Sequence, residues 1–69
     1  MREIIYSDHA RKRMKQRGIT ELEVQHVLQY SLYVKKTIEG RKEAVGTIQH
    51  RTIKVVFIVE NYIKIITIM

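Results

Sequence analysis

The 69-residue sequence contains no cysteine, which excludes several sources of stability and several kinds of chemistry. Disulfide bonds, thiolate metal ligands and a cysteine nucleophile are all ruled out. A chain this short buries only about 60% of its unfolded surface, so stabilisation from outside its own core is expected. Because no disulfide can supply that stabilisation, we expect a homodimer or a tightly bound protein partner. The lack of cysteine also fits a reducing cytoplasm.

Proline is absent as well, and long apolar runs are missing. Lysine or asparagine interrupts the longest apolar runs well before the roughly 18 residues that a membrane-spanning helix needs. The first ten residues, MREIIYSDHA, are too polar for a signal peptide. The sequence therefore predicts a single domain over residues 1–69 that is cytoplasmic and has no membrane association.

Negative charge is scarce at the start of the chain, where the positive charge is concentrated. The formal net charge is +6, and residues 1–18 carry six basic and two acidic side chains. The other 51 residues carry seven basic and five acidic side chains. Such a concentration is typical of a surface that binds nucleic-acid phosphate, although a solvated helix face would have the same composition.

The basic segment carries the start and stop signals of a short helix. Ser7 and Asp8 are both favourable N-cap residues, and Gly18 stands where a glycine ends a helix, so a helix is expected over Asp8–Arg17. Ala10 and Met14 lie four residues apart and form a narrow apolar stripe that would face the core. The rest of the helix surface is left for polar contacts.

One row on this predicted helix collects the candidate functional residues. His9, Arg13 and Arg17 step by four residues and run beside the apolar stripe, and Lys12 and Gln16 widen the row. The forked guanidinium groups suit phosphate, so Lys12, Arg13, Gln16 and Arg17 are the predicted nucleic-acid-binding residues. The alternative is that the arginines pair with glutamates elsewhere in the chain.

An imidazole can act as acid or base near neutral pH, which makes His9 the candidate catalytic group. Arg13, Arg17 and Lys54 complete the predicted catalytic set, with Tyr62 as another candidate for the second titrating group. The alternative for His9 is a local hydrogen bond at the helix start. Neither of the other histidines has a second ligand at metal-binding spacing, and glycine-rich phosphate loops are missing, so no metal or cofactor is expected.

The remaining sequence predicts a scaffold. Thr20 and Glu23 form the T-x-x-E capping box of a second helix, which is expected over Glu21–Tyr30. Its predicted buried face consists of Leu22, Val24, Val27, Leu28 and, one turn further on, Leu32.

Isoleucine and valine dominate after Tyr33 and favour strands. Strands are expected over Tyr33–Ile38, Arg41–Ile48, Arg51–Val59 and Tyr62–Ile68, with Arg2–Tyr6 as a lead-in or edge strand. The expected hairpin loops are Glu39-Gly40, Gln49-His50 and Glu60-Asn61.

The last loop sets a register for the final two strands. If Val59 pairs with Tyr62, then Phe57 faces Lys64 and Lys54 faces Thr67. The predicted fold class is thus α+β: two N-terminal helices packed on a three- to four-stranded antiparallel β-meander.

The string S-D-H-A-x-x-R-M-x-x-R-G-I-T runs from Ser7 to Thr20 and resembles the signature of a small prokaryotic family of unknown function, domain family 4258. The resemblance extends over nearly the whole chain, including Thr67 in the last strand. In layout the family is similar to toxin ribonucleases of the RelE and colicin types. That likeness implies a metal-independent endoribonuclease that acts as a toxin beside an antitoxin, with His9, Arg13 and Arg17 as the motif residues.

Three functions follow from these observations. The leading hypothesis is a toxin-like endoribonuclease that acts on RNA. The second is a non-catalytic module that binds nucleic acid through the basic helix, with an affinity that falls steeply with salt. The third is a protein-interaction domain whose basic helix meets an acidic partner.

Overall fold

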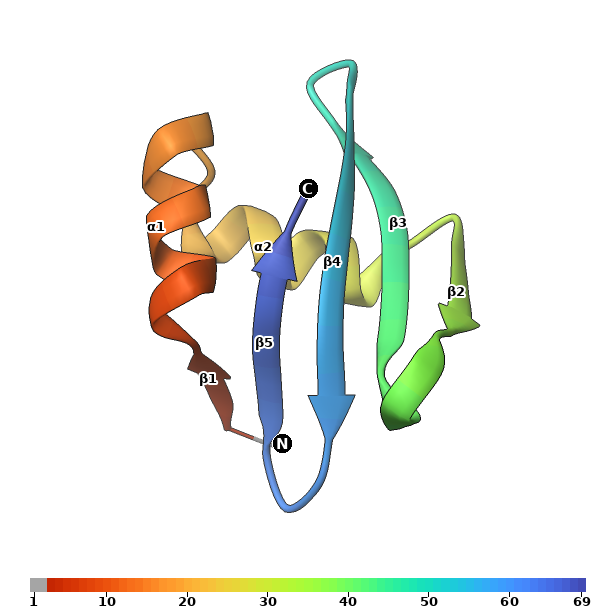
Figure 1. The fold of residues 1–69 in the computed structure, drawn as a ribbon. Helices are drawn as coiled ribbons and strands as arrows, with labels where there is room; N and C mark the ends of the chain where they lie inside the picture. The colour runs from red at the N-terminus through yellow and green to blue at the C-terminus, as the bar shows by residue number, and fades with distance from the viewer. Residues whose placement is uncertain (1–2) are drawn as a thin grey trace.

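The computed structural model describes residues 3–69 and contains a five-stranded sheet and two helices, one across a face of the sheet and one beside its edge (Figure 1). The elements are β1 (Ile4–Tyr6), α1 (Asp8–Arg17), α2 (Glu21–Gln29), β2 (Tyr33–Lys36), the 3-10 turn Ile38–Gly40, β3 (Lys42–Ile48), β4 (Arg51–Val59) and β5 (Ile63–Ile68). Along the sheet the strands follow the order β1-β5-β4-β3-β2. The predicted α+β class with N-terminal helices on a sheet is confirmed, but the sheet has five strands and is mixed.

The strand that the predicted meander did not count is β1, which was expected only as a lead-in or edge strand. It pairs with β5 in parallel. Ile63 donates its backbone N–H to the carbonyl oxygen of Glu3 at 2.8 Å, and Tyr6 lies opposite Ile65. A wholly antiparallel meander was therefore wrong at this edge. No hairpin joins β1 to β5, so no turn signal in the sequence specifies the direction of their pairing. Arg2, which the expected lead-in included, lies outside the described residues.

Helix α1 begins and ends at the predicted residues. The Ser7 hydroxyl accepts a hydrogen bond from the N–H of Ala10 at 3.0 Å. At the other end Gly18 has φ 66°, a left-handed conformation that glycine adopts without steric cost. This conformation lets Ile19 donate its N–H to the carbonyl oxygen of Met14 at 2.9 Å, which closes the helix.

Helix α2 starts at the predicted capping box, in which both hydrogen bonds form between Thr20 and Glu23. It lies across β3 and β4, whereas α1 runs beside β5, so the two helices meet at a corner (Figure 1). Val24 and Val27 are buried. The predicted burial of Leu22 is wrong, because its side chain is 77% exposed.

Leu32 is also mostly exposed, and Leu28 is partly buried against the core. A helix as short as α2 covers the sheet with a narrow face only. Leu22 lies on α2 outside that face, and Leu32 lies beyond the end of the helix at Gln29, so both remain in solvent although their spacing fits an amphipathic helix.

The three hairpins agree with the predicted loops to different degrees. Gln49-His50 forms the predicted two-residue loop, with φ 47° and 71°, between β3 and β4. Glu39 and Gly40 also have positive φ, but the 3-10 turn around them makes β2 end at Lys36, two residues earlier than predicted.

The predicted register of β4 and β5 is wrong by one residue. Val59 pairs with Ile63, because the connecting loop has three residues, Glu60–Tyr62, in place of two. Beyond the pair of Phe57 with Ile65 a bulge shifts the register once more.

The core lies between the sheet and the two helices. Its fully buried sheet residues alternate with residues that point to the opposite side, as the period of a strand requires. The core includes Ala10, Met14, Val24, Val27, Ile53, Val55, Phe57, Ile65 and Ile68.

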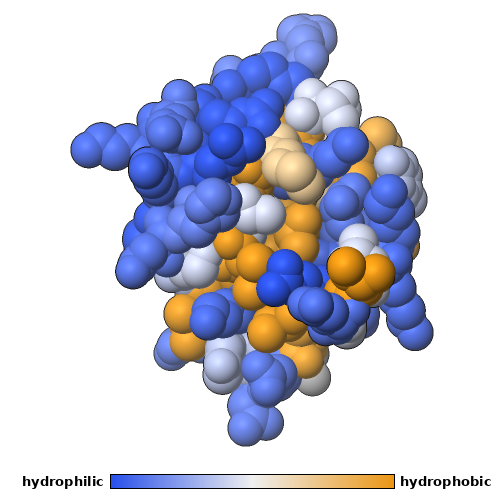
Figure 2. Space-filling model, viewed as in Figure 1, coloured by the Kyte–Doolittle hydropathy of each residue, from blue (hydrophilic) through white to orange (hydrophobic). Residues whose placement is uncertain are grey.

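Within residues 3–69 no helix covers the side of the sheet opposite α2, which we call the open face. Its residues alternate with those of the core and include Ile5, Lys35, Glu43, Val45, Lys54, Val56, Ile58, Lys64 and Thr67. Figure 2 shows this face, where apolar side chains lie beside the hydrophilic block that α1 presents.

Candidate nucleic-acid interface

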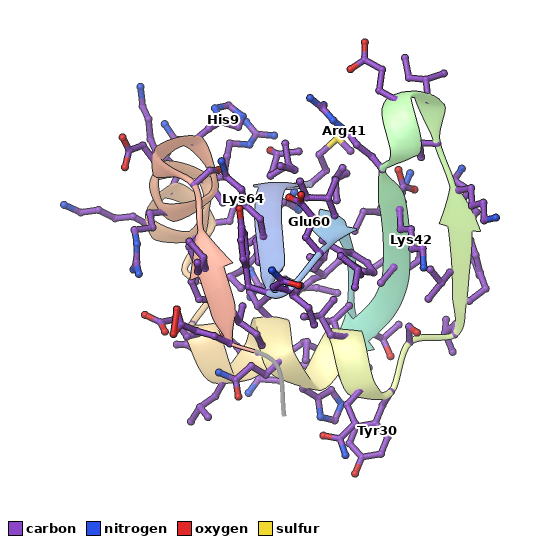
Figure 3. The ribbon with its side chains drawn as sticks, turned by 90° about the horizontal axis from the view of Figure 1, so that it is seen from below. His9, Tyr30, Arg41, Lys42, Glu60 and Lys64 are labelled. Atoms are coloured by element: carbon purple, nitrogen blue, oxygen red, sulfur yellow. The ribbon has the colours of Figure 1, made fainter. Side chains whose placement is uncertain are left out.

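The position of His9 follows from the anchoring of Ser7. The Ser7 hydroxyl donates to the carbonyl oxygen of Ile66 at 2.7 Å, and the Ser7 N–H donates to the carbonyl oxygen of Ile65 at 3.0 Å. The first turn of α1 is thereby fixed to β5. His9 is exposed and projects on the open side of the sheet, opposite α2 (Figure 3).

Arg13 is half-buried and uses one of its donors within the fold. Its Nε donates to the carbonyl oxygen of Ile68 at 3.3 Å. The parallel pairing with β1 ends at Ile65, so carbonyl groups further along this edge of β5 have no strand partner among the described residues. Ser7 takes one of them and Arg13 the other. The two terminal nitrogens of Arg13 make no hydrogen bond among residues 3–69 and are available to a phosphate.

Arg17 ends α1 with an exposed side chain. Its backbone carbonyl oxygen accepts a hydrogen bond from Nη1 of Arg51 at 2.9 Å. A cation at this position also complements the negative end of the helix dipole. Arg51, the first residue of β4, is thus brought to the end of the basic row.

The other polar residues of α1 lie on the sides of the helix that their spacing predicts. Lys12 and Gln16 are exposed. Arg11 points to the opposite side, where its guanidinium lies 5.1 Å from the centre of the Tyr6 ring and 3.4 Å from a carboxylate oxygen of Glu21. The charge of Arg11 therefore has a partner at the surface in Glu21, whereas His9, Arg13 and Arg17 form no ion pair with the described residues.

Lys54 lies on the open face near the anchor of Arg13. Its backbone is bonded to Met69 in both directions, at 2.9 and 2.8 Å, and Met69 follows the residue that Arg13 contacts. Lys54 and Arg13 thus approach the same end of β5 from opposite sides.

Tyr62 does not join them. It precedes β5 by one residue, so Met69 lies seven positions further along the chain, which corresponds to roughly 20 Å along a strand. The structure therefore separates two residues that the sequence analysis grouped together.

The open face is basic. Among the charged side chains that residues 3–69 place on the sheet there, three are lysines, namely Lys35, Lys54 and Lys64, and the carboxylate is that of Glu43. Glu43 is only 8% exposed, and its carboxylate lies 3.7 Å from the ammonium of Lys35. Two positive charges therefore remain without a carboxylate partner on this face.

Glu43 is not among the site residues predicted from the sequence. The signal that could have found it is a charged residue one position inside a strand of otherwise small and apolar residues, KEAVGTI. A buried carboxylate requires a partner, and Lys35 provides it.

The remaining histidines lie away from the basic row. His26 packs against Tyr30 on α2, with 5.0 Å between the ring centres, and His50 occupies the hairpin loop. Within residues 3–69, no three histidine, aspartate or glutamate side chains gather in a way that could hold a metal ion. None of the helices in this range is long and apolar enough to cross a membrane.

The family model named "Domain of unknown function (DUF4258)" matches residues 6–69. The chain therefore belongs to this uncharacterised family, as the string from Ser7 to Thr20 predicted. No curated protein and no solved structure gives a significant match. The likeness in layout to RelE- and colicin-type ribonucleases thus stays a prediction.

Proposed function

We propose that this protein is a metal-independent endoribonuclease that binds RNA between the basic row of α1 and the open face of the sheet. One observation carries the proposal: His9 projects on the same side of the sheet as Lys64 (Figure 3), Lys54 lies on that face by its strand register, and Arg13 follows His9 on the same helix. A titratable imidazole, a forked cation and ammonium groups are the components that phosphate-ester cleavage uses.

Each group has a defined role in the proposed reaction. Arg13, through its terminal nitrogens, and Arg17 bind the scissile phosphate and stabilise the charge that develops on it. His9 takes the proton from the ribose 2′-hydroxyl, whose oxygen attacks phosphorus and forms a 2′,3′-cyclic phosphate. The bond from phosphorus to the 5′-oxygen breaks, and Lys54 gives that oxygen a proton. Lys12 and Gln16 bind neighbouring phosphate or sugar groups.

The biological setting that we propose is a toxin–antitoxin system. Its support is the motif string of α1 together with the expected likeness to toxin ribonucleases. In that setting an antitoxin-like protein, encoded by a neighbouring reading frame, would hold the basic surface inactive until it is removed.

A second candidate function is non-catalytic binding of nucleic acid by the same surface. The half-burial of Arg13 and the bond from its Nε to the Ile68 carbonyl favour it, because that side chain is already anchored in the fold. The distance of Tyr62 from Lys54 also reduces the number of possible second titrating groups. This function requires the charges of the row but no proton transfer by His9.

The test uses two single-stranded oligonucleotides of the same sequence, one RNA and one with every 2′-hydroxyl replaced by hydrogen. With EDTA present, the endoribonuclease cuts the RNA to products with 2′,3′-cyclic phosphate ends and binds the deoxy strand without cutting it. Binding of both strands with no cutting, over a broad set of RNA sequences, would reject the nuclease and leave the binding module. Failure to bind either strand at low salt would reject both functions.

A further inference from the structure

Exposed apolar side chains are concentrated around the edge strand β2. Within residues 3–69, eight large apolar side chains are exposed, and five of them lie in the short stretch around this strand. The five are Tyr30, Leu32, Tyr33, Val34 and Ile38. Apolar groups gathered in this way are typical of a surface that another protein covers.

The backbone of β2 is also free to pair. Thr37 donates its N–H to the carbonyl oxygen of Arg41 at 2.8 Å, which makes these two residues a hydrogen-bonded pair next to the strand. Bonded and non-bonded pairs alternate along an antiparallel ladder. The N–H and C=O groups of Val34 and Lys36 therefore point away from β3, toward the free edge of the sheet.

Two lysines, Lys36 on β2 and Lys42 on β3, place positive charge next to this free edge. Lys36 lies directly opposite Lys42, and like charges in that arrangement repel each other. The closest acidic side chains in sequence are already used, since Glu39 lies 3.8 Å from Arg41 and Glu43 pairs with Lys35. The two opposed lysines thus lack a counter-charge from the described residues.

A pocket of about 390 Å³ opens beside the two lysines. Thr37, Gly40 and Arg41 complete its lining, and Arg41 and Lys42 are labelled in Figure 3. A carboxylate that entered the pocket would meet cationic groups from both β2 and β3.

We propose that β2 docks an extended acidic segment of a partner protein, which adds to the sheet as a sixth strand. The segment carries an apolar residue opposite Val34 and an aspartate or glutamate opposite Lys36. Since residues two apart share a face of a strand, the partner is recognised by an apolar and an acidic residue separated by one position. The backbone of the segment pairs with the free groups of the edge.

Two features favour an acidic partner over a second copy of this chain. Each copy carries a net charge of +6, and pairing of β2 with β2 would bring four lysines together along the new edge.

The proposal goes beyond RNA cleavage, because β2 and β5, the strand that α1 packs beside, are separated in the sheet by β3 and β4. Its test requires no RNA.

The probe is a synthetic ten-residue peptide that alternates valine with threonine and has two glutamates, each placed two residues from a valine. A matched peptide has lysines at the glutamate positions. Titrated into isotopically labelled protein, the acidic peptide shifts amide signals of β2 and slows hydrogen exchange at Val34 and Lys36. The lysine peptide binds at least about tenfold more weakly, because its charges meet those of Lys36 and Lys42.

Two charge-reversal variants at exposed positions show whether the acidic peptide binds at β2 or is attracted only by the overall positive charge of the protein. Lys36→Glu weakens the acidic peptide about tenfold or more, whereas Lys12→Glu on α1, with the same change in net charge, weakens it less than about twofold. Amide spectra of both variants check that they fold. Equal weakening by the two variants, signal shifts outside β2, or self-association of the unliganded protein through β2 in sedimentation would each overturn the proposal.

Discussion

Arg51 Nη1 donates a hydrogen bond of 2.9 Å to the carbonyl oxygen of Arg17, which connects the β3–β4 hairpin to the last turn of α1. The two residues are 34 positions apart in the sequence. With the anchors of Ser7 and Arg13 on β5, this bond fixes the basic helix at its beginning, middle and end. The helix that carries His9, Arg13 and Arg17 is therefore attached to the sheet at three points.

Arg51→Ala should lower the free energy of unfolding by about 1 kcal/mol, because a charged donor at the carbonyl end of a helix is lost. Urea unfolding followed by circular dichroism measures the change. Arg41→Ala is the control: its exposed ion pair with Glu39 has a separation of 3.8 Å and contributes little. An equal loss in the two variants would contradict the role of Arg51.

Ser7→Ala should be more destabilising than Thr20→Ala, although both residues cap helices. Loss of a cap costs about 1 kcal/mol in either case. The Ser7 hydroxyl also donates to the Ile66 carbonyl, which would be left without this partner, so a total of about 2 kcal/mol is expected. Thermal or urea unfolding of the two variants gives the comparison. A Thr20→Ala variant that is the less stable of the two would show that the bond to Ile66 adds nothing.

Tyr6 should make the protein less stable in alkali. Burial raises the pKa of its phenol above the ordinary value of 10.0, and the nearby side chain of Gln25 offsets part of that shift. Above pH 10 the unfolded chain loses the proton before the folded chain does, so the contribution to stability is present below pH 10 and is lost as pH rises through the folded pKa. The unfolding free energy of Tyr6→Phe should fall less steeply there than that of the wild type.

The same variant has a defined expectation at neutral pH. The Tyr6 hydroxyl is buried and forms no hydrogen bond of ordinary geometry with the described residues. Its removal should leave stability unchanged or raise it by up to about 1 kcal/mol. A clear loss of stability near pH 7, together with an unchanged alkaline slope, would contradict this interpretation.

Arg17→Gln should weaken RNA binding and make it less dependent on salt. If the guanidinium of Arg17 contacts one phosphate, the slope of log affinity against log salt concentration should fall by about 1 in magnitude. Arg11→Gln removes the same charge from the other side of α1, where the side chain faces Tyr6 and Glu21, and should leave the slope nearly unchanged. Identical slopes for the two variants would place the RNA elsewhere.

Local signals made the helices predictable. A hydroxyl at Ser7, a glycine at Gly18 and the T-x-x-E box from Thr20 to Glu23 act within a few residues, and the helix starts follow them. Exposure of Leu22 could not be inferred, because it depends on how much of α2 the sheet covers.

Strand pairing was less accessible to sequence reasoning. One additional residue in the loop Glu60–Tyr62 changes which residue of β5 each residue of β4 pairs with. The bulge between Val56 and Phe57 has no sequence signal, because it lies within a run of apolar residues. The parallel pairing of β1 depends on the path of the chain through α1.

The part of the candidate site that lies on α1 could be predicted from the sequence, whereas the part that lies on the sheet could not. The spacing of His9, Arg13 and Arg17 placed these residues on one side of α1, but did not reveal the anchoring of Arg13 on Ile68. The near approach of Lys54 to that anchor, the separation of Tyr62 and the burial of Glu43 all depend on strand register, which the sequence did not determine.

The rate of RNA cleavage by His9→Ala, compared with that by His26→Ala, tests the proposed function most directly. Both histidines are exposed on helices, so neither substitution should disturb the core, and both variants should bind RNA with nearly the affinity of the wild type. Single-turnover cleavage should slow by about 100-fold or more in His9→Ala and stay unchanged in His26→Ala. Equal rates in the two variants and the wild type would contradict a catalytic His9.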